Sequence, residues 1–445
     1  MKYRQSFYNI LYEDAKMKGA LLYNTFTGAL IRIDDSNYQN IRDLLSDPNN
    51  IKLRNAEIDK FQKMLELGFI VEEETDELSL VRLRHFNGVF KSEEYFALTI
   101  ILTFSCNFKC IYCYETPQNK HLNEIDLQEI IRYTKTKLQN NKYKKMYIGW
   151  YGGEPLLCSE LLIKLSQTLR QLCSDNGLSY YSALITNGYL LTYELGQILK
   201  ESGVDEIQIT LDGPELIHNK RRILKNGNPT FEEIKRAILV AADIFNKVKV
   251  RINVDRDNLT SIDNLLKERW LYRDNIQLGV GHLKDYSDVC SLWNPSNLAL
   301  TGEEYYALVK KVEQSTPRKK LPDLKTLISI PVKSRVCGAD HKDGFCIGPG
   351  ARVYKCLSAL DIHEAVGYLK SGKFWPNKRY ANWLMNDPTE QTECCRCNIL
   401  PLCMGGCPYY RQNRAESINR SICTFWRAFL HSHLGQIASC LAERR

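Results

Sequence analysis

The sequence lacks the features that mark a membrane or secreted protein. No apolar run in its 445 residues approaches the roughly 20 residues that a membrane-spanning helix needs. The first residues, MKYRQSFYNILYEDAK, are interrupted by charge every few positions and do not resemble a signal peptide. Internal repeats and low-complexity tracts are also absent. These absences predict a cytoplasmic protein with no membrane partner.

The sequence also lacks a concentrated basic region. Its net charge is +8, but residues 1–90 hold 12 Lys and Arg against 14 Asp and Glu, so the surplus is spread over the remainder. A nucleic-acid-binding surface would gather Lys and Arg on one face or stripe. The charge pattern therefore predicts a solvated surface and no nucleic-acid partner.

Cysteine, in contrast, is abundant. Sixteen cysteines are present. Because thiols of cytosolic proteins stay reduced, clustered cysteines in such a protein favour metal ligation or catalysis over a disulfide framework.

Residues 1–90 have the pattern of a small separate domain. Two helical stretches, SNYQNIRDLL and AEIDKFQKMLELGFIV, follow three short strand candidates, and the second stretch places Phe61, Met64, Leu65 and Phe69 on one face. Three strands followed by two helices predict a winged-helix-like domain. The strand candidates are NILYE, GALLYN and ALIRID, with a turn at NTFTG before the third.

From about residue 97 to residue 283, β-rich runs alternate with helical stretches. Six such runs with helical crossovers predict an α/β fold with a parallel sheet, either open or curled into a partial barrel. Loops at the carboxyl ends of such strands usually carry the chemistry. The six runs are ALTIILTF, MYIGWY, YSALIT, EIQITLD, VKVRINV and IQLGVG.

The C-terminal part has a different composition. Residues 337–423 contain nine cysteines, several Gly and Pro residues and little periodicity. We therefore expect this part to lack an apolar core and to need metal for folding.

The stretch CNFKCIYCYE carries three cysteines in a loop after the first strand of the sheet: Cys106, Cys110 and Cys113. A structural zinc site would need a fourth protein ligand, and the loop contains neither Asp nor His. Three thiolates suit an iron-sulfur cluster in which one iron keeps an open position for a substrate.

With Tyr112 before the third cysteine, this motif resembles that of the radical SAM superfamily. The resemblance implies a 4Fe-4S cluster on the three cysteines, with S-adenosylmethionine bound to the fourth iron. It also implies a 5′-deoxyadenosyl radical that removes a hydrogen atom from the substrate. The implied fold is a partial (β/α)6 TIM-like barrel over residues 91–300.

Further motifs follow the next strands in the order of that family, although each alone is also typical of an ordinary turn. The glycines of GGEP let the backbone approach a ligand closely. The resemblance implies cofactor contacts through the GGEP backbone to the methionine amino group, through polar side chains to the ribose, and through an arginine to the methionine carboxylate. The residues are Gly152, Gly153 and Glu154 after the second strand and Asn187 after the third. After the fourth strand, Thr210 and Asp212 are implied to contact the ribose and Arg222 the carboxylate. Asn253 lies at the end of the fifth strand.

The cysteines of residues 301–445 resemble the SPASM extension of radical SAM enzymes, which holds two auxiliary 4Fe-4S clusters. One departure is that five residues separate Gly350 from Cys356 where the family has four. Zinc is the alternative for such C-x-x-C pairs. The resemblance implies that auxiliary cluster I is held by Cys337, Cys356 and Cys407, with Cys346 as fourth ligand unless one iron stays open for substrate. It implies that auxiliary cluster II is held by Cys394, Cys397, Cys403 and Cys423. Cys395 is interpreted as a packing neighbour, and Cys158, Cys173, Cys290 and Cys440 are assigned no role.

These features together predict a maturase that cross-links a ribosomal precursor peptide. Residues 1–90 resemble the peptide-recognition element of such enzymes, which would bind the leader as an added strand. A thioether is the first choice of bond, and a carbon-carbon or carbon-oxygen link is the alternative. A flavodoxin or ferredoxin is the expected reductant. No catalytic base can be assigned.

Two other interpretations remain open. A sulfatase-maturing enzyme, which forms formylglycine, would share the auxiliary clusters, but such relatives place an Asp after the cysteine that matches Cys356, where this chain has Leu357 and Ser358. A peptide-binding iron-sulfur protein without turnover would form no 5′-deoxyadenosine.

Overall fold

The computed structural model divides into two compact units. Unit 1 comprises residues 1–91, 319–337 and 386–445, and unit 2 comprises residues 92–318 and 338–385. The domain bounds 1–90, 91–300 and 301–445 stay a prediction. Cys290 lies outside the described residues, which are 1–14, 17–50, 57–91, 94–115, 118–140, 143–283, 298–315, 328, 330, 332–412 and 416–442.

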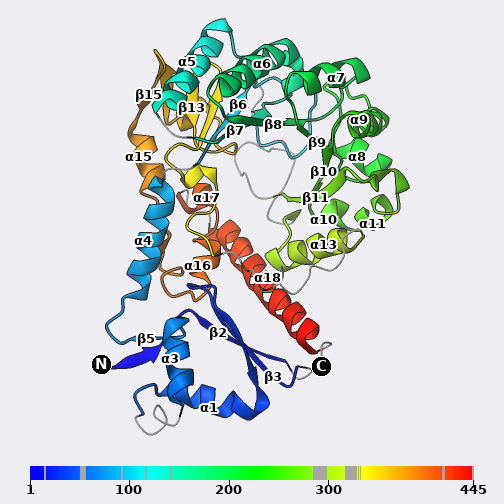
Figure 1. The fold of residues 1–445 in the computed structure, drawn as a ribbon. Coiled ribbons are helices and arrows are strands. Elements are labelled where there is room, and N and C mark those ends of the chain that lie inside the picture. The colour runs from blue at the N-terminus through cyan, green and yellow to red at the C-terminus, as the bar shows by residue number, and fades with distance from the viewer. Residues whose placement is uncertain are drawn as a thin grey trace. The chain divides into compact units, whose positions relative to one another are not determined.

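Unit 2 is built on a ten-stranded mixed sheet (Figure 1). Six strands pair in parallel and in chain order, β6 (Tyr95–Ile101), β7 (Lys145–Tyr151), β8 (Ser179–Thr186), β9 (Glu206–Thr210), β10 (Lys247–Val254) and β11 (Ile276–His282). β12 (Phe345–Gly348) pairs parallel with β6, and β13 (Arg352–Tyr354), β14 (Gly367–Lys370) and β15 (Lys373–Pro376) continue antiparallel. The predicted α/β fold with a parallel sheet is confirmed.

Helices connect the parallel strands and lie along the outer side of the sheet in Figure 1. The longer helices bury an apolar stripe: in α6, Leu162, Leu165 and Leu169 are fully buried at helical spacing. Because β6 to β11 run parallel, their carboxyl ends share one edge of the sheet. The helices are α5 (Glu124–Asn140), α6 (Ser159–Asp175), α7 (Tyr193–Glu201), α8 (Glu215–Arg221), α9 (Phe231–Ile244), α10 (Arg256–Leu259), α11 (Ile262–Leu265), α13 (Gly302–Ser315) and α15 (Lys378–Leu384).

Unit 1 begins with the predicted strands and helices. β2 (Asn9–Asp14), β3 (Gly19–Asn24) and β4 (Leu30–Asp34) form an antiparallel sheet, and α1 (Asp35–Ser46) and α3 (Ile58–Glu66) follow. Phe61, Met64 and Phe69 are buried against the sheet, as the helical spacing predicts. The second helix is shorter than predicted, because Gly68 adopts a positive φ of 78° and the chain enters β5 (Ile70–Glu72), which pairs with β1 (Tyr3–Gln5).

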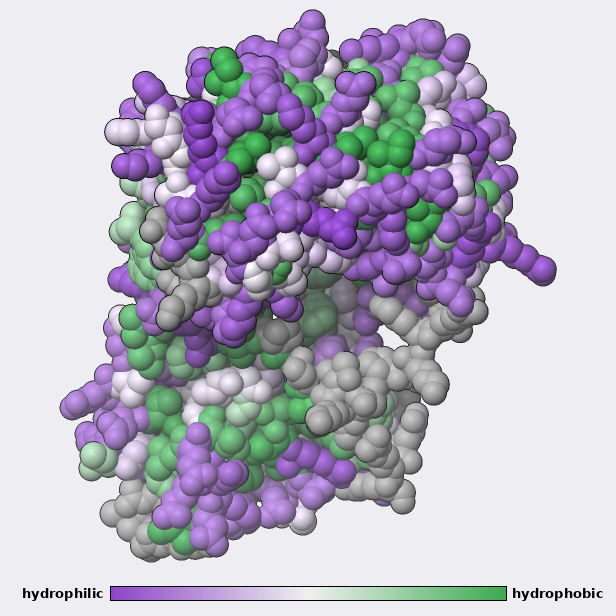
Figure 2. Space-filling model, turned by 45° about the horizontal axis from the view of Figure 1, so that its top comes forward, coloured by the Kyte–Doolittle hydropathy of each residue, from purple (hydrophilic) through white to green (hydrophobic). Residues whose placement is uncertain are grey.

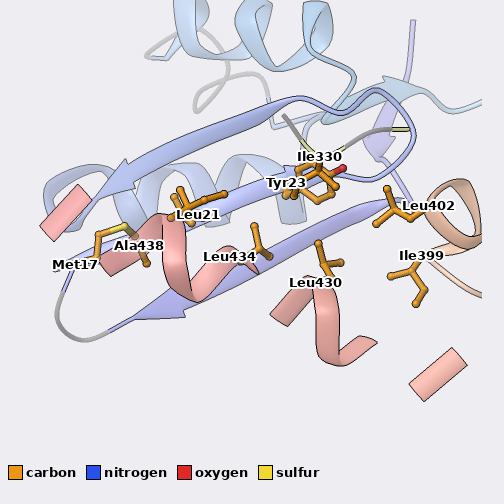
Figure 3. Packing of buried hydrophobic residues seen from close by; sticks show 10 residues of the cluster. Met17, Leu21, Tyr23, Ile330, Ile399, Leu402, Leu430, Leu434 and Ala438 are labelled. Atoms are coloured by element: carbon orange, nitrogen blue, oxygen red, sulfur yellow. The ribbon is translucent and has the colours of Figure 1, made fainter. Parts of the chain in front are cut away.

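The expectation that the cysteine-rich end lacks an apolar core is wrong. The long helix α18 (Glu416–Ala442) packs Leu430 and Leu434 against Leu21 of β3, and Leu402 joins the same cluster (Figure 3). The apolar partners come from the opposite end of the chain, so no local periodicity could reveal them. Two short helices precede α18: α16 (Leu400–Cys403) and α17 (Pro408–Gln412).

Helix α4 (Glu77–Phe90) is a further element of unit 1 that the sequence analysis did not assign. The Asp76 side chain caps it by accepting a hydrogen bond from the Ser79 N–H. Its buried Val81 packs against Tyr8, Leu400 and Met404, so α4 links the first residues of the chain to the cysteine-rich end.

The visible surface is mostly hydrophilic (Figure 2). Hydrophilic side chains cover most of the face shown in Figure 2, with hydrophobic residues in separate patches. None of the described helices combines the length and apolar character needed to cross a bilayer.

Candidate functional site

The three-cysteine loop lies beyond the carboxyl end of β6 and is fixed by a neighbouring loop. The Lys109 N–H donates to the Ile223 carbonyl at 2.8 Å, and the Ile111 N–H donates to the Arg221 carbonyl at 3.1 Å. These bonds connect the cysteine loop to the segment after β9, where the sequence predicts cofactor contacts.

The cysteines of this loop lie within electrostatic reach of one another. Burial raises the pKa of the Cys106 thiol to about 12, and the charge of Cys110 adds to the effect. Burial also raises the pKa of Cys113, with contributions from Glu115, Cys110 and Cys106. Buried thiols that oppose each other's ionisation become thiolates only beside a strong positive charge, and iron provides one. This donor set therefore fits an iron-sulfur cluster.

No group of three Cys, His, Asp or Glu side chains among the described residues converges as the ligands of a single metal ion do. Each cysteine of a four-iron cluster binds a different iron, so its sulfur atoms lie farther apart than ligands of one ion.

The glycines of GGEP are needed for contact between two backbone segments. A Cβ on Gly152 would lie 2.5 Å from the Thr103 carbonyl oxygen, and a Cβ on Gly153 would lie 2.4 Å from the Ser105 carbonyl oxygen. The Gly153 N–H donates to the Thr103 carbonyl at 2.9 Å. The sequence analysis expects these glycines to let a ligand approach the backbone. In the structure, the segment that approaches them is the one that follows β6 and leads into Cys106.

Glu154 joins the GGEP loop to the end of β8. Its fully buried carboxylate accepts hydrogen bonds from the Leu156 N–H at 2.9 Å, the Thr186 hydroxyl at 2.6 Å and the Asn187 N–H at 2.7 Å. The Asn187 side chain then donates to Asn107 Oδ1 at 2.7 Å, beside Cys106. Glu154 is therefore a structural anchor that positions Asn187 next to the cysteine loop.

Four of the predicted cofactor residues form one buried polar network. The Tyr112 hydroxyl donates to the Asp212 carboxylate. It accepts hydrogen bonds from Arg222 at 2.8 Å and from Asn253 Nδ2 at 3.2 Å. The Asn253 N–H also donates to Asp212 Oδ1 at 3.2 Å. Thr210 is buried nearby at the end of β9.

Sequence reasoning missed Arg221, the neighbour of Arg222. Its guanidinium donates to both Asp255 oxygens at 2.9 Å and lies 5.1 Å from the centroid of the Tyr112 ring. Nε of Arg222, and Nε and a terminal nitrogen of Arg221, are buried without a hydrogen-bond partner. Unsatisfied buried donors beside the cysteine loop fit an anionic ligand such as the methionine carboxylate.

A second missed residue is Glu115, two positions after the third cysteine. Burial raises the pKa of Glu115 to about 7, and a hydrogen bond from Tyr151 opposes that rise. Its Oε2 atom is buried without a hydrogen-bond partner. The Tyr151 hydroxyl, at the carboxyl end of β7, also lies 2.6 Å from that of Tyr114. The only signal in the sequence is the nearness of Glu115 to Cys113.

The four cysteines predicted for auxiliary cluster II all belong to unit 1 and lie within electrostatic reach of one another. Burial raises the pKa of Cys394 to about 12, and the charges of the other three members of the set add to this effect. Burial likewise raises the pKa of Cys403 to about 11. Arg427 of α18 donates to Cys397 Sγ at 3.6 Å. The donor set, Cys394, Cys397, Cys403 and Cys423, fits an iron-sulfur cluster.

The residues predicted for auxiliary cluster I divide between the units. Cys337 and Cys407 belong to unit 1, and Cys346 and Cys356 belong to unit 2. Cys346 is buried on β12 in an apolar cluster with Ile101 and Tyr354. That these cysteines share one cluster stays a prediction.

Among the described cysteines without an assigned role, three make ordinary contacts. Cys173 is buried in α6 with its sulfur 3.3 Å from Met146 Sδ. Cys395 Sγ donates to the Thr392 carbonyl at 3.2 Å. Cys440 packs against the cluster that α18 forms with β3.

Comparison with known protein families identifies the segment that carries the first site. Residues 100–268 match the model of the radical SAM superfamily. This segment includes the cysteine loop, the GGEP loop and the buried network, so the predicted radical SAM enzyme is confirmed at that level. The match implies an iron-sulfur cluster and S-adenosylmethionine as cofactors.

Three curated relatives are similar to this chain. A cysteine-type anaerobic sulfatase-maturating enzyme of Clostridium perfringens is 28% identical over 153 residues, 34% of this chain and 40% of that protein. A serine-type enzyme of the same description from Klebsiella aerogenes is 22% identical, over 73% of this chain and 82% of that protein. The radical SAM cyclopropyl synthase TigE of Paramaledivibacter caminithermalis is 24% identical, over 55% of each. This chain thus spans less than half the length of the Clostridium perfringens enzyme.

Solved structures share the fold. Native anSMEcpe with bound AdoMet and Cp18Cys peptide has a TM-score of 0.61 at 19% identity, covering 79% of this chain and 100% of that one. Streptococcus suis SuiB bound to precursor peptide SuiA has a TM-score of 0.51 at 13% identity, covering 91% of this chain and 95% of that one. Both neighbours bind peptides.

Proposed function

We propose, from the premise that residues 100–268 are those of a radical SAM superfamily enzyme, that this chain is a peptide maturase. Its reaction would remove hydrogen from a ribosomal precursor peptide and close an intramolecular cross-link, with a thioether as the first choice. The observation that carries this proposal is the cysteine loop beside a buried polar network with unpartnered donors.

The chain's own residues would hold and orient the cofactors. Cys106, Cys110 and Cys113 would hold the iron-sulfur cluster, and the network around Tyr112 and Asp212 would bind S-adenosylmethionine. When bound, these groups supply a 5′-deoxyadenosyl radical. Burial of the network keeps water away from the reacting atoms, and fixed hydrogen bonds keep the donors in place.

The sheet of unit 1 supports leader binding. Within the described residues β4 pairs with β3 alone, so its other edge offers backbone groups to an added strand. A groove of about 220 Å³ lies between this sheet and α1 and is lined by Leu22 and Ile33 of the sheet and by Ile41 and Leu45 of α1. An extended leader could pair with β4 and place an apolar side chain in this groove.

The position of Cys346 bears on the bond that forms. Sequence analysis leaves it as either the fourth ligand of auxiliary cluster I or a bystander. Its burial among Ile101, Phe104 and Tyr354 agrees with both alternatives, because Cys394, a predicted ligand of auxiliary cluster II, also packs against an apolar cluster. A cluster with three cysteine ligands keeps one iron open for a substrate thiolate, which favours thioether formation.

The test is anaerobic incubation of the reconstituted protein with S-adenosylmethionine, dithionite and the short peptide encoded beside the gene. The expected result is 5′-deoxyadenosine together with a peptide that has lost two hydrogen atoms per link. An unchanged peptide mass despite cofactor cleavage contradicts cross-linking. The absence of 5′-deoxyadenosine supports the third alternative, a peptide-binding iron-sulfur protein without turnover.

The similarity to sulfatase-maturating enzymes favours a second candidate, oxidation of a cysteine or serine to formylglycine. Leu357 and Ser358 stand where the resemblance expects an Asp, which weakens it. A peptide product that carries an aldehyde, detected by hydrazide labelling, would favour this candidate over the cross-linking maturase.

A further inference from the structure

One face of α4 carries an apolar groove that the proposed function does not use. The groove has a volume of about 730 Å³ and lies wholly within unit 1. Leu80, Leu83 and Phe90 line it and are 41%, 58% and 45% exposed. Large apolar side chains exposed together on one helix are typical of a protein-binding surface. We name this feature the α4 groove.

The charge of the α4 groove has one sign. Two cationic side chains, Arg84 and Lys91, line it, and its described lining contains no carboxylate. Arg84 is fixed there, because it donates to the Phe26 carbonyl at 2.6 Å and lies 3.8 Å from the centroid of the Phe26 ring. An apolar surface with basic residues complements a partner that is apolar at its centre and acidic around it.

The opposite face of α4 lies against the second cysteine set. Val81 packs in one cluster with Leu400 and Met404, and Phe26 and Cys394 pack against that cluster. Phe26 therefore contacts the α4 groove on one side and the cluster that includes Cys394 on the other. An α-helix is about 10 Å across, so a protein seated in the groove would lie about one helix diameter from a predicted ligand of auxiliary cluster II.

The reaction needs a partner of this kind. Cleavage of S-adenosylmethionine takes up one electron per turnover, and closing a cross-link on a substrate radical releases one electron to the carrier and one proton to water, so the carrier delivers and then recovers a single electron. We propose that the α4 groove is the docking surface for a small acidic protein that carries single electrons on a flavin. The inference rests on the proposed function, since a carrier is needed only if the chain cleaves S-adenosylmethionine reductively.

Two other occupants fit the groove less well. A leader peptide is expected at a strand edge, whereas the groove is lined by a helix, a turn and Ser334. In a symmetric contact with a second copy, Arg84 and Lys91 would face their own counterparts and repel each other. Electron-transfer complexes are typically small, which suits a surface of this size.

The test uses the reconstituted full chain and oxidised flavodoxin as the probe. Leu83→Glu and Lys91→Glu change the apolar and the charged part of the groove, and both side chains are exposed, so folding should be retained. Ile125→Glu, at a side chain that is 73% exposed on α5, is the matched control. We expect both groove variants to raise the Kd for flavodoxin at least tenfold and the control to leave it unchanged. Added salt should weaken binding to the unaltered chain and have less effect on Lys91→Glu.

A second measurement compares two electron sources for 5′-deoxyadenosine formation. The groove variants should lose at least tenfold in the flavodoxin-driven rate and keep the dithionite-driven rate. The docking proposal would be overturned if the groove variants bound flavodoxin as tightly as the unaltered chain, or if they lost the flavodoxin-driven and the dithionite-driven rates equally. It would also be overturned if the substitutions abolished self-association of the chain or binding of the precursor peptide. Failure of dithionite to produce 5′-deoxyadenosine in the unaltered chain would instead overturn the proposed function, whatever the flavodoxin affinity.

Discussion

The two cysteine sets that come together in this protein are held in different ways. Cys106, Cys110 and Cys113 belong to one short loop, fixed through backbone hydrogen bonds to the segment after β9. The set in unit 1 takes three cysteines from residues 394–403 and a fourth, Cys423, from α18. The first set is local in sequence, whereas the second joins two separate elements.

Their surroundings differ as well. The loop in unit 2 lies beside the Tyr112 network, where buried donors of Arg221 and Arg222 have no hydrogen-bond partner. Cys394 and Cys397 pack against apolar clusters that contain Leu400 and Leu402, whereas in the loop of unit 2 Cys110 packs against a smaller cluster of Tyr112 and Leu283. Polar donors without partners indicate a site for a ligand, and apolar walls indicate a closed site. The first set is therefore suited to chemistry, and the second to supporting the fold and carrying electrons.

The largest expected effect separates these roles. Cys113→Ala should reduce 5′-deoxyadenosine formation to background with little change in Tm, because backbone bonds still hold the loop. Cys403→Ala should lower the Tm, by about 2–4 °C for each kcal/mol of folding free energy that the metal provides. Thermal unfolding, iron content and product assays on anaerobically reconstituted protein would measure this.

Cys158→Ala is the control, because that half-buried cysteine belongs to neither set. Equal losses of Tm in Cys113→Ala and Cys403→Ala would remove the distinction between a reactive site and a structural one.

The difference between the sets also explains how much the sequence could predict. The loop in unit 2 and its partners follow successive strands, and parallel strands bring their carboxyl ends to one edge. The resemblance to the radical SAM superfamily, together with this order, grouped Tyr112, Asp212 and Asn253. Arg221 was missed because nothing in the sequence distinguishes its role from that of the adjacent Arg222. Only the structure shows that Arg221 is buried and donates to Asp255.

Unit 1 was harder to predict, because its core joins the two ends of the chain. Leu430 and Leu434 of α18 pack with Met17 and Leu21, more than 400 residues earlier in the sequence. Periodicity reports one apolar face of a helix but not the partner that covers it. The same limit applies to α4, whose buried Val81 meets Leu400.

A second prediction tests the polar surroundings of the first set. Asp212→Asn removes the negative charge that holds Tyr112 and faces Arg221. Hydrogen bonds to charged groups contribute about 1.5–3 kcal/mol, so S-adenosylmethionine should bind roughly 10- to 100-fold more weakly. Anaerobic titration calorimetry would measure the Kd. Asp263→Asn, which breaks a surface ion pair with Lys311, is the matched control and should leave the Kd unchanged.

A third prediction concerns Cys346, which the apolar cluster of unit 2 surrounds. If it is a core residue, Cys346→Ala should keep the full iron content, whereas Cys356→Ala should lose about four iron atoms per chain. Iron and sulfide analysis with Mössbauer spectroscopy would check both variants. A loss of about four iron atoms from Cys346→Ala would restore this cysteine as a ligand of auxiliary cluster I and weaken the case for an open iron.

The smallest expected effect concerns Arg427, the one charged group seen to donate to a cysteine of the second set among the described residues. A cation beside a cluster favours its reduced, more negative state, so Arg427→Met should lower the midpoint potential of auxiliary cluster II. Because Arg427 is exposed, the interaction is worth about 0.2–1 kcal/mol, which corresponds to roughly 10–40 mV for one electron.

Redox titration followed by electron paramagnetic resonance would measure the potential of this cluster. Arg420→Met removes the same charge from an exposed position on the same helix and is the control. Equal shifts in both variants would mean that α18 acts only through its overall charge. A shift confined to Arg427→Met would show that one hydrogen bond to Cys397 adjusts the potential of this cluster.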